Sequence, residues 1–241
     1  MPQAILLLGP TGSGKTPLGE MLQARGLGTG RCIHFDFGDR LRRIASGQLN
    51  VAELAGDDRA FITKVLDRGA LLEDEHFGVA EKILRAFLAE QNARPYDQVV
   101  LNGLPRHVGQ ADDVDRIVTV RLVIELSCSA KTVRRRLAID AGGDRAGRID
   151  DAPASVCKKL ELYTRRTEGL LDHYRSLGAA VISLTVGPET TAQDAWRDLI
   201  LREPERLQQH SPGQSEAPPW VLAANITQAL KGRNTRYHGK L

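Results

Sequence analysis

Short apolar segments alternate along the chain with longer amphipathic ones. The first apolar segment, residues 4–8, contains no polar side chain and ends at Gly9, as expected of a parallel strand that is buried on both faces. Four further segments have strand-like length and composition, at residues 32–35, 98–101, 121–126 and 180–184. Strands that alternate with helices predict a parallel sheet covered by helices on both sides.

Segments with helical periodicity separate these strands. The first follows a glycine-rich turn and places Leu18, Met21 and Leu22 on one face before it reaches Gly26. Six more helices are predicted, over residues 39–46, 59–67, 74–91, 130–139, 152–177 and 192–201. We therefore predict an α/β, three-layer fold with a five-stranded parallel sheet, flanked by helices and joined by right-handed crossovers.

The C-terminal end differs in composition from the body. Residues 204–219 are rich in Pro, Gln and Ser, which predicts a linker, and a short helix is expected after Trp220. From residue 206 onward five basic residues accompany a single acid, so the tail carries +4 and the body −1 of the formal net charge of +3. The nearly neutral body argues against a nucleic-acid partner, and the sequence identifies no partner for the basic tail, residues 206–241.

Composition and cysteine content narrow the class of protein. The chain has 241 residues, 41% of them apolar and 26% charged, which is typical of a globular protein with a sizeable core. Its N-terminal apolar run is too short for a membrane helix and lacks the basic flank of a signal peptide. Cys32, Cys128 and Cys157 lie far apart and form no CxxC pair. We expect a reduced, cytoplasmic protein without membrane contact, and a monomer.

Residues 9–16, with the sequence GPTGSGKT, match the phosphate-binding pattern G-x-x-x-x-G-K-[ST] between a predicted strand and a predicted helix. The glycines allow backbone N–H groups to converge on phosphate oxygens, and the positive end of the helix dipole faces the same anion. Lys15 supplies a cation for the β- and γ-phosphates, and the Thr16 hydroxyl is a ligand for Mg²⁺. The motif predicts a nucleoside triphosphate site composed of Gly9, Gly12, Ser13, Gly14, Lys15 and Thr16.

Four more segments, in order, resemble motifs of the nucleoside monophosphate kinases of the adenylate kinase family. Residues 38–42 (GDRLR) resemble G-D-x-L-R, and residues 69–75 (GALLEDE) resemble G-x-L-V-x-D-E. Residues 102–110 (NGLPRHVGQ) resemble D-G-F-P-R-x-x-x-Q, and residues 148–151 (RIDD) match R-x-D-D. The resemblance covers about residues 4–202 and leaves the tail outside it.

The resemblance implies that ATP is the phosphoryl donor, that Mg²⁺ is the cofactor, and that a nucleoside monophosphate is the acceptor. Arg42 and Arg106 would bind the acceptor phosphate as bidentate guanidinium groups. Leu71 and Leu72 would flank the acceptor base, and the Gln110 amide would read adenine. The further acceptor-site residues are Asp36, Phe37, Gly38 and Gly103.

The resemblance also divides the chain. It implies a P-loop core of residues 1–35, 80–135 and 150–205, a monophosphate-binding insert of residues 36–79, and a lid of residues 136–149. The segment between Arg136 and Arg148 contains no cysteine or histidine, so we expect a short lid without zinc. Its glycines suit a segment that opens and closes.

Donor-side and catalytic roles follow from the same resemblance. Arg148 would contact the phosphoryl group in transfer, together with Lys15 and Arg106. Lys159 stands where the family has an arginine on the last long helix, and it keeps the charge without the guanidinium fork. The family arginine that precedes the lid has no clear match, which leaves Arg135, Arg136 and Arg145 as candidates, and Gly187 is a further candidate for the ATP site.

Other departures concern the metal and the acceptor. Asn102 stands where the family has an aspartate that orients Mg²⁺-bound water, and Asp36 at the end of the second strand is the candidate that compensates, by contact or through water. Phe37 stands where a small hydroxyl residue contacts the acceptor base. The segment between Arg42 and Gly69 is longer than usual for the family.

Three functions remain open at this point. The leading one transfers the γ-phosphoryl group of Mg·ATP to AMP (ATP + AMP = 2 ADP). The second is a kinase for CMP, UMP or another small acceptor, since Phe37 and the longer insert would reshape that pocket. The third is a non-catalytic nucleotide-binding regulator. Three arginines, Arg42, Arg106 and Arg148, favour catalysis, because a sensor needs only one nucleotide site.

Overall fold

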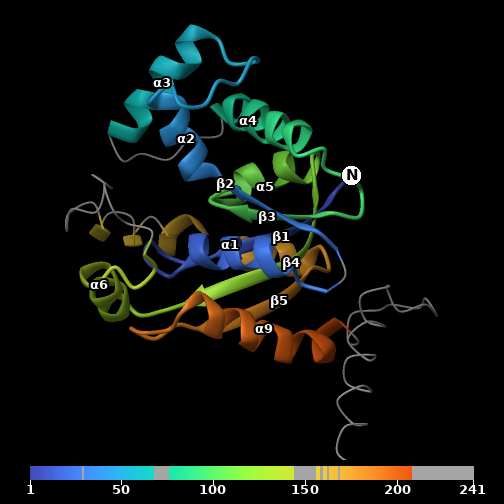
Figure 1. The fold of residues 1–241 in the computed structure, drawn as a ribbon, viewed down its shortest axis with the longest axis vertical. Coiled ribbons are helices and arrows are strands. Elements are labelled where there is room, and N and C mark those ends of the chain that lie inside the picture. The colour runs from blue at the N-terminus through green and yellow to red at the C-terminus, as the bar shows by residue number, and fades with distance from the viewer. Residues whose placement is uncertain are drawn as a thin grey trace, which may run out of the picture.

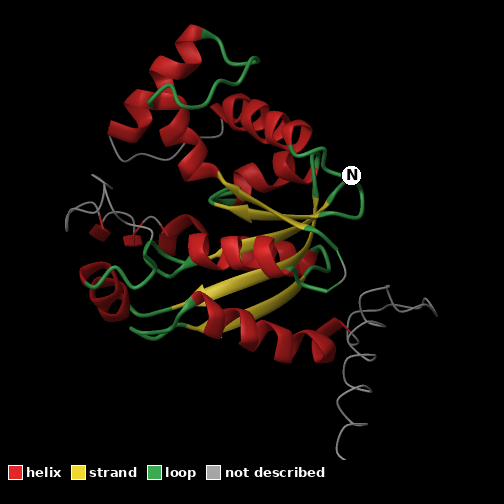
Figure 2. Cartoon of the chain, in the orientation of Figure 1, coloured by secondary structure: helices red, strands yellow, loops and turns green. Residues whose placement is uncertain are grey.

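Five parallel strands form the centre of the computed structural model (Figures 1 and 2). In chain order they are β1 (Gln3–Leu8), β2 (Cys32–Asp36), β3 (Gln98–Asn102), β4 (Thr119–Ser127) and β5 (Ala180–Thr185). Their order across the sheet is β2-β3-β1-β4-β5, and every pairing is parallel. The prediction of a five-stranded parallel sheet is confirmed. The structure describes residues 1–28, 30–67, 76–143, 156–157, 160–161, 163–167 and 169–207.

Helices cover both faces of the sheet (Figure 2). The described ones are α1 (Lys15–Arg25), α2 (Phe37–Ala45), α3 (Gly56–Asp67), α4 (Phe77–Glu90), α5 (Val108–Asp115), α6 (Ala130–Ala138), a π-helical turn η3 (Tyr163–Thr167), α8 (Gly169–Ser176) and α9 (Ala192–Leu207). Helices α1 and α9 pack on one face, and α4, α5 and α8 pack on the other. Helices α2 and α3 extend beyond the β2 edge, at the top of Figure 1.

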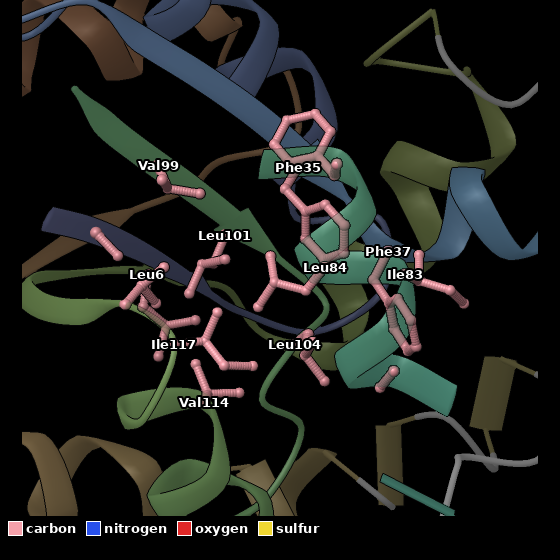
Figure 3. Close-up of a cluster of buried hydrophobic side chains, with 14 of the residues drawn as sticks. Leu6, Phe35, Phe37, Ile83, Leu84, Val99, Leu101, Leu104, Val114 and Ile117 are labelled. Carbon is pink, nitrogen blue, oxygen red and sulfur yellow. The ribbon is translucent and has the colours of Figure 1, made fainter. Parts of the chain in front are cut away.

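Alternate residues of each strand enter two separate hydrophobic clusters. In β1, Ile5 and Leu7 pack with Leu18 and Leu22 of α1, whereas Leu6 packs on the opposite face with α4 and α5. Figure 3 shows this second cluster, built from strand and helix side chains: Leu6, Phe35, Phe37, Ile83, Leu84, Val99, Leu101, Leu104, Val114 and Ile117. Because both faces are covered, the strands read as continuous apolar runs.

The structure adds one helix that the sequence pattern did not predict. Helix α5 is short and polar, and only Gln110, Ala111 and Val114 of its eight residues are buried, so its periodicity is weak. Helix α9 continues to Leu207, into the segment that we predicted as a linker. The predicted helix at 152–177 lies partly outside the described residues, within which η3 and α8 occupy it. The helix expected after Trp220 lies outside the described residues.

None of the helices in the described part of the chain combines the length and apolar character that crossing a membrane requires.

A close contact sets the spacing between α1 and β2. A Cβ atom at Gly19 would lie 2.2 Å from Nε2 of His34, so the imidazole occupies the volume that any other residue at position 19 would need. Burial lowers the pKa of His34, although Asp36 and Asp39 oppose this effect. The His34 ring packs against the helix at Gly19. The contact places α1, which begins with Lys15, close to the strand that ends at Asp36.

Replacing Gly19 by alanine tests this contact. We expect Gly19→Ala to lower the free energy of unfolding by about 1–3 kcal/mol, because overpacking forces the ring or the helix to move. The matched control is Gly78→Ala, at an exposed position of α4 where no atom lies within 4 Å of the added Cβ. This substitution should raise the free energy of unfolding by about 0.4–1 kcal/mol. Urea unfolding followed by circular dichroism measures both. Equal stabilisation by the two substitutions would contradict the close contact. In the double variant Gly19→Ala/His34→Ala the ring is absent, so this variant should regain the stability that Gly19→Ala loses.

Candidate active site

The carboxyl ends of three neighbouring strands meet at one edge of the sheet. Strand β3 lies between β2 and β1, and the register pairs Asn102 with both Asp36 and Leu7. The loop that begins at Gly9 follows β1 directly. In parallel α/β sheets, ligands bind at this edge, and the predicted phosphate loop and metal residues lie together there.

The phosphate-binding loop adopts the conformation that its glycines permit. Gly9, Gly12 and Gly14 have φ angles of 148°, 75° and 98°, values that favour glycine. Gly14 is the N-cap of α1, so the positive end of the helix faces the loop. The ammonium group of Lys15 donates hydrogen bonds to the carbonyl oxygens of Gly9 (2.6 Å) and Pro10 (2.8 Å). Its charge therefore lies directly over the loop.

Thr16, Asp36 and Asn102 form a closed triangle of hydrogen bonds. The Thr16 hydroxyl donates to Oδ2 of Asp36 at 2.6 Å. Nδ2 of Asn102 donates to the same Oδ2 at 2.8 Å and to Oγ1 of Thr16 at 3.0 Å. The first turn of α1 and the ends of β2 and β3 thus place three oxygen-bearing side chains next to the loop.

The carboxyl group of Asp36 is ionised in this setting. Burial is the largest influence and raises its pKa, but hydrogen bonds from Thr16 and from the backbone N–H of Asp39, with the charges of His34 and Arg42, outweigh burial and lower the pKa overall. Oδ1 accepts the Asp39 N–H at 2.8 Å and so caps α2. One oxygen orients a helix and the other faces Thr16 and Asn102.

The two predicted acceptor-site arginines lie near the ends of β2 and β3. The Arg42 guanidinium is 3.8 Å from the Asp39 carboxylate and about one third exposed. A Cβ at Gly38 would lie 3.3 Å from Nη1 of Arg42. Nε of Arg106 donates to the Gly103 carbonyl at 2.9 Å. The fold thus brings both cations to the ends of β2 and β3.

The structure places Phe37 and Gln110 next to Arg106. We expected Phe37 to contact the acceptor base, but its side chain is 1% exposed and belongs to the hydrophobic core, with the Arg106 guanidinium 5.8 Å from its ring centroid. We expected the Gln110 amide to read adenine, but Oε1 accepts the backbone N–H of Arg106 at 3.0 Å and the residue is buried. Both side chains therefore support Arg106.

Arg136 connects the phosphate loop to the segment after β5. Its side chain is buried, with Nε donating to the Gly12 carbonyl at 2.9 Å. Nη1 donates to the carbonyls of Gly187 (2.9 Å) and Thr190 (2.8 Å). Of the two described arginine candidates near the predicted lid, Arg135 and Arg136, Arg136 is the one that bonds the loop, and it also bonds Gly187.

A cavity of about 170 Å³ lies beside Arg136. Its lining combines loop and helix residues with the ends of β4 and β5: Ser13, Gly14, Pro17, Leu126, Arg136, Ala141, Gly142, Val186, Thr190, Thr191, Ala192 and Ala195. Sites for drug-sized ligands occupy roughly 300–1,000 Å³, so this cavity suits one part of a larger ligand. The lining is largely apolar, which suits a planar base.

Sequence reasoning missed Arg40. Its side chain is 8% exposed and bonds Glu90 of α4 at 2.7 Å, and its guanidinium lies 4.5 Å from the Phe87 ring centroid. This contact joins α2, which carries Arg42, to α4. Arg40 occupies the variable position of the 38–42 motif, so the motif held no signal for it.

Cys128 is a second residue that the motifs did not indicate. It follows β4, and burial raises the pKa of its thiol against the opposing charges of Lys15 and Arg136. Its position directly after a predicted parallel strand was the one sequence feature that could have placed it near the carboxyl ends of the strands.

Five predicted site residues lie outside the described residues: Leu71, Leu72, Arg145, Arg148 and Lys159.

Known proteins with similar sequences are adenylate kinases. One from Parvibaculum lavamentivorans is 28% identical over 186 residues, which cover 72% of this chain and 80% of that protein. One from Streptomyces avermitilis is 27% identical over 233 residues, 83% of this chain and 97% of its own. A solved gluconokinase from Sinorhizobium meliloti 1021 shows a TM-score of 0.46 and 15% identity, with 97% of this chain and 98% of that chain covered.

No family model matches the sequence. The adenylate kinase of Xanthomonas campestris pv. campestris (strain B100) is 30% identical over 181 residues, which cover 72% of this chain and 86% of that protein. With a relative of that identity spanning more than two thirds of both sequences, and with a phosphate loop at the carboxyl edge of a parallel sheet, this chain belongs to the adenylate kinase family.

Proposed function

We propose that this chain transfers the γ-phosphoryl group of Mg·ATP to a nucleoside monophosphate, with AMP as the acceptor (ATP + AMP = 2 ADP). The observation that carries the proposal is the triangle of Thr16, Asp36 and Asn102. It joins the Lys15 loop to the strand ends where Arg42 and Arg106 lie. We expect the enzyme to act in the cytoplasm as a monomer.

The donor nucleotide would bind across the loop and the adjacent cavity. Its phosphates would meet the Lys15 ammonium and the loop N–H groups, which are the usual partners of an anion at a helix N-terminus. Its base would enter the cavity beside Arg136 and Gly187, which is lined mainly by small and apolar side chains. The proposed lid, residues 136–149, would then close over the donor and exclude water.

The triangle fits Mg²⁺ by the chemistry of its donors. Mg²⁺ prefers hard oxygen ligands and keeps several waters, and the site offers the Thr16 hydroxyl with the ionised Asp36 carboxylate. Thr16 would bind the ion, while Asp36 and Asn102 would orient its waters. When bound, the ion neutralises charge on the transferring phosphoryl group.

The acceptor would lie on the far side of the triangle from the Lys15 loop. A monophosphate is already an anion at neutral pH, so the reaction needs positioning and charge neutralisation more than a base. Arg42 and Arg106 supply two guanidinium groups for this phosphate. We propose Arg148 and Lys159 as further cations for the transfer, and Leu71 and Leu72 of the 36–79 insert as contacts of the base.

A pyrimidine monophosphate is the second candidate acceptor. Oε1 of Gln110 already accepts the backbone N–H of Arg106, so this oxygen is committed before any base arrives. Adenine recognition by Gln110 would have to share that oxygen or rely on other groups.

The direct test is a coupled assay for ADP with Mg·ATP and AMP, CMP, UMP, GMP or dAMP supplied separately. We expect ADP formation with AMP, at a rate that falls by at least about 10³-fold in Lys15→Ala, since losing a cation on the transferring phosphate costs about 10³–10⁵. ADP formation with CMP or UMP but not with AMP would identify a pyrimidine monophosphate as the acceptor. Hydrolysis of ATP independent of any acceptor would refute the kinase proposal.

Exchange of the two strand-end residues tests the role of Asp36. We expect Asp36→Asn to lower kcat about 10–100-fold and to raise the Mg²⁺ concentration needed for half-maximal rate, because an oriented carboxylate is lost. The double variant Asp36→Asn/Asn102→Asp returns one carboxylate to the triangle and should recover most of the loss. Asp172→Asn, at an exposed carboxylate that pairs with Arg175, is the control. A double variant no better than Asp36→Asn would show that the carboxylate must stand on β2.

Removal of one guanidinium tests the acceptor assignment. We expect Arg106→Ala to raise KM for the acceptor about 10–150-fold, the loss of a hydrogen bond to a charged group worth about 1.5–3 kcal/mol, with little change in KM for ATP. Arg116→Ala removes an exposed arginine that pairs with Asp113 and should change neither. Initial-rate measurements with each substrate varied separate the two constants. Equal increases in both would contradict the role of Arg106.

A further inference from the structure

We propose that Asp112, Asp115 and His173 form a binding site for one divalent transition-metal ion such as Zn²⁺. Asp112 and Asp115 lie one turn apart on α5, and His173 lies on α8, which packs against it. One ligand atom from each residue lies within 4.8 Å of the other two. The three side chains therefore converge from two helices that are far apart in the sequence.

The spacing of these atoms suits a single small ion. Two ligands bound at about 2.1 Å with tetrahedral geometry are about 3.4 Å apart. Nε2 of His173 is 3.6 Å from Oδ2 of Asp115, which is close to that separation. Asp112 is exposed, so a modest side-chain movement brings its carboxylate to the same distance. Imidazole with two carboxylates is a donor set for Zn²⁺ and related ions.

Two buried polar atoms at this position lie near the Asp115 carboxylate without a hydrogen bond of good geometry. They are Nε2 of His173 and the Tyr174 hydroxyl. Tyr174 is 1% exposed. An unpaired buried polar group is costly. An ion with its bound water would satisfy the imidazole nitrogen and give the hydroxyl a partner.

The neighbouring aromatic ring holds the His173 imidazole in place. The imidazole of His173 packs edge-on against the Tyr174 ring, with 4.9 Å between centroids, and this contact orients Nε2.

The site lies apart from the proposed active site but on an element connected to it. Helix α5 begins just after Arg106, and its buried Gln110 holds the Arg106 backbone. Near the start of α8, a Cβ at Gly169 would lie 3.4 Å from Val108. An ion between Asp112, Asp115 and His173 would therefore cross-link the other ends of this helix pair. The sequence analysis considered zinc only for the lid and expected none there. His173 is far from Asp112 and Asp115 in the sequence, and only the fold brings them together.

Zinc titration of the full-length, chelator-treated protein without nucleotide tests the proposal. We expect calorimetry to show one bound Zn²⁺ per chain, together with an increase in Tm. Substituting Co²⁺ should give an absorption spectrum with the d–d bands of a nitrogen-containing site. Asp112→Asn and His173→Gln should each weaken binding by at least about 10-fold, because even loss of a group that orients a metal ligand costs about 10–100-fold in affinity.

Neighbouring acids provide matched controls. Asp113→Asn lies next to Asp112 but pairs with Arg116, and Asp172→Asn lies next to His173 but pairs with Arg175. Neither should change zinc affinity. Because Asp112 is exposed, its variant should fold as the parent does, which circular dichroism checks. Absence of stoichiometric binding, or equal affinity in Asp112→Asn, His173→Gln and the parent, would overturn the proposal without bearing on the kinase activity.

Discussion

The shared carboxylate of Asp36 is the interaction on which the arrangement of the site depends. Its Oδ1 caps α2 through the Asp39 N–H, and its Oδ2 receives the Thr16 hydroxyl and the Asn102 amide. One side chain thus fixes the first turn of the loop helix, the end of β3 and the start of the helix that carries Arg42. Hydrogen bonds that outweigh burial keep the group ionised, so the same atoms that organise the backbone also carry negative charge.

Two buried contacts hold the phosphate loop against the sheet. Behind the loop, His34 of β2 fills the space left by the missing side chain of Gly19, which brings α1 close to the strand. On the other side, Arg136 bonds the Gly12 carbonyl and the carbonyls after β5. A cation satisfied by fixed carbonyl groups is rigid, because its planar donors match several acceptors at once. The loop is therefore oriented before any nucleotide binds, which reduces the entropy that binding must overcome.

Sequence patterns predicted the sheet closely because its strands are buried on both faces. The predicted strand at 98–101 differs from the observed β3 only by the addition of Asn102, for example. Local motifs identified Lys15, Thr16, Arg42 and Arg106 as candidate site residues, and the structure places them at the loop and near the ends of β2 and β3. Motifs could not predict partners that the fold supplies. The engagement of Gln110 by a backbone N–H depends on an unpredicted helix, and Phe37 enters the core because α4 covers it.

The position of the strand-end carboxylate shows how far a local pattern constrains chemistry. The family pattern that the sequence resembles has an aspartate at the end of β3, where this chain has Asn102. Parallel register makes Asp36 the direct neighbour of Asn102, and their side-chain atoms are 2.8 Å apart. A negative charge at either strand end therefore reaches nearly the same point beside Thr16. One carboxylate at that point stays ionised more easily than two, since two like charges in contact would raise the pKa of one of them. An asparagine at one strand end and an aspartate at the other give a single carboxylate there, which is why the two positions are best understood as a pair.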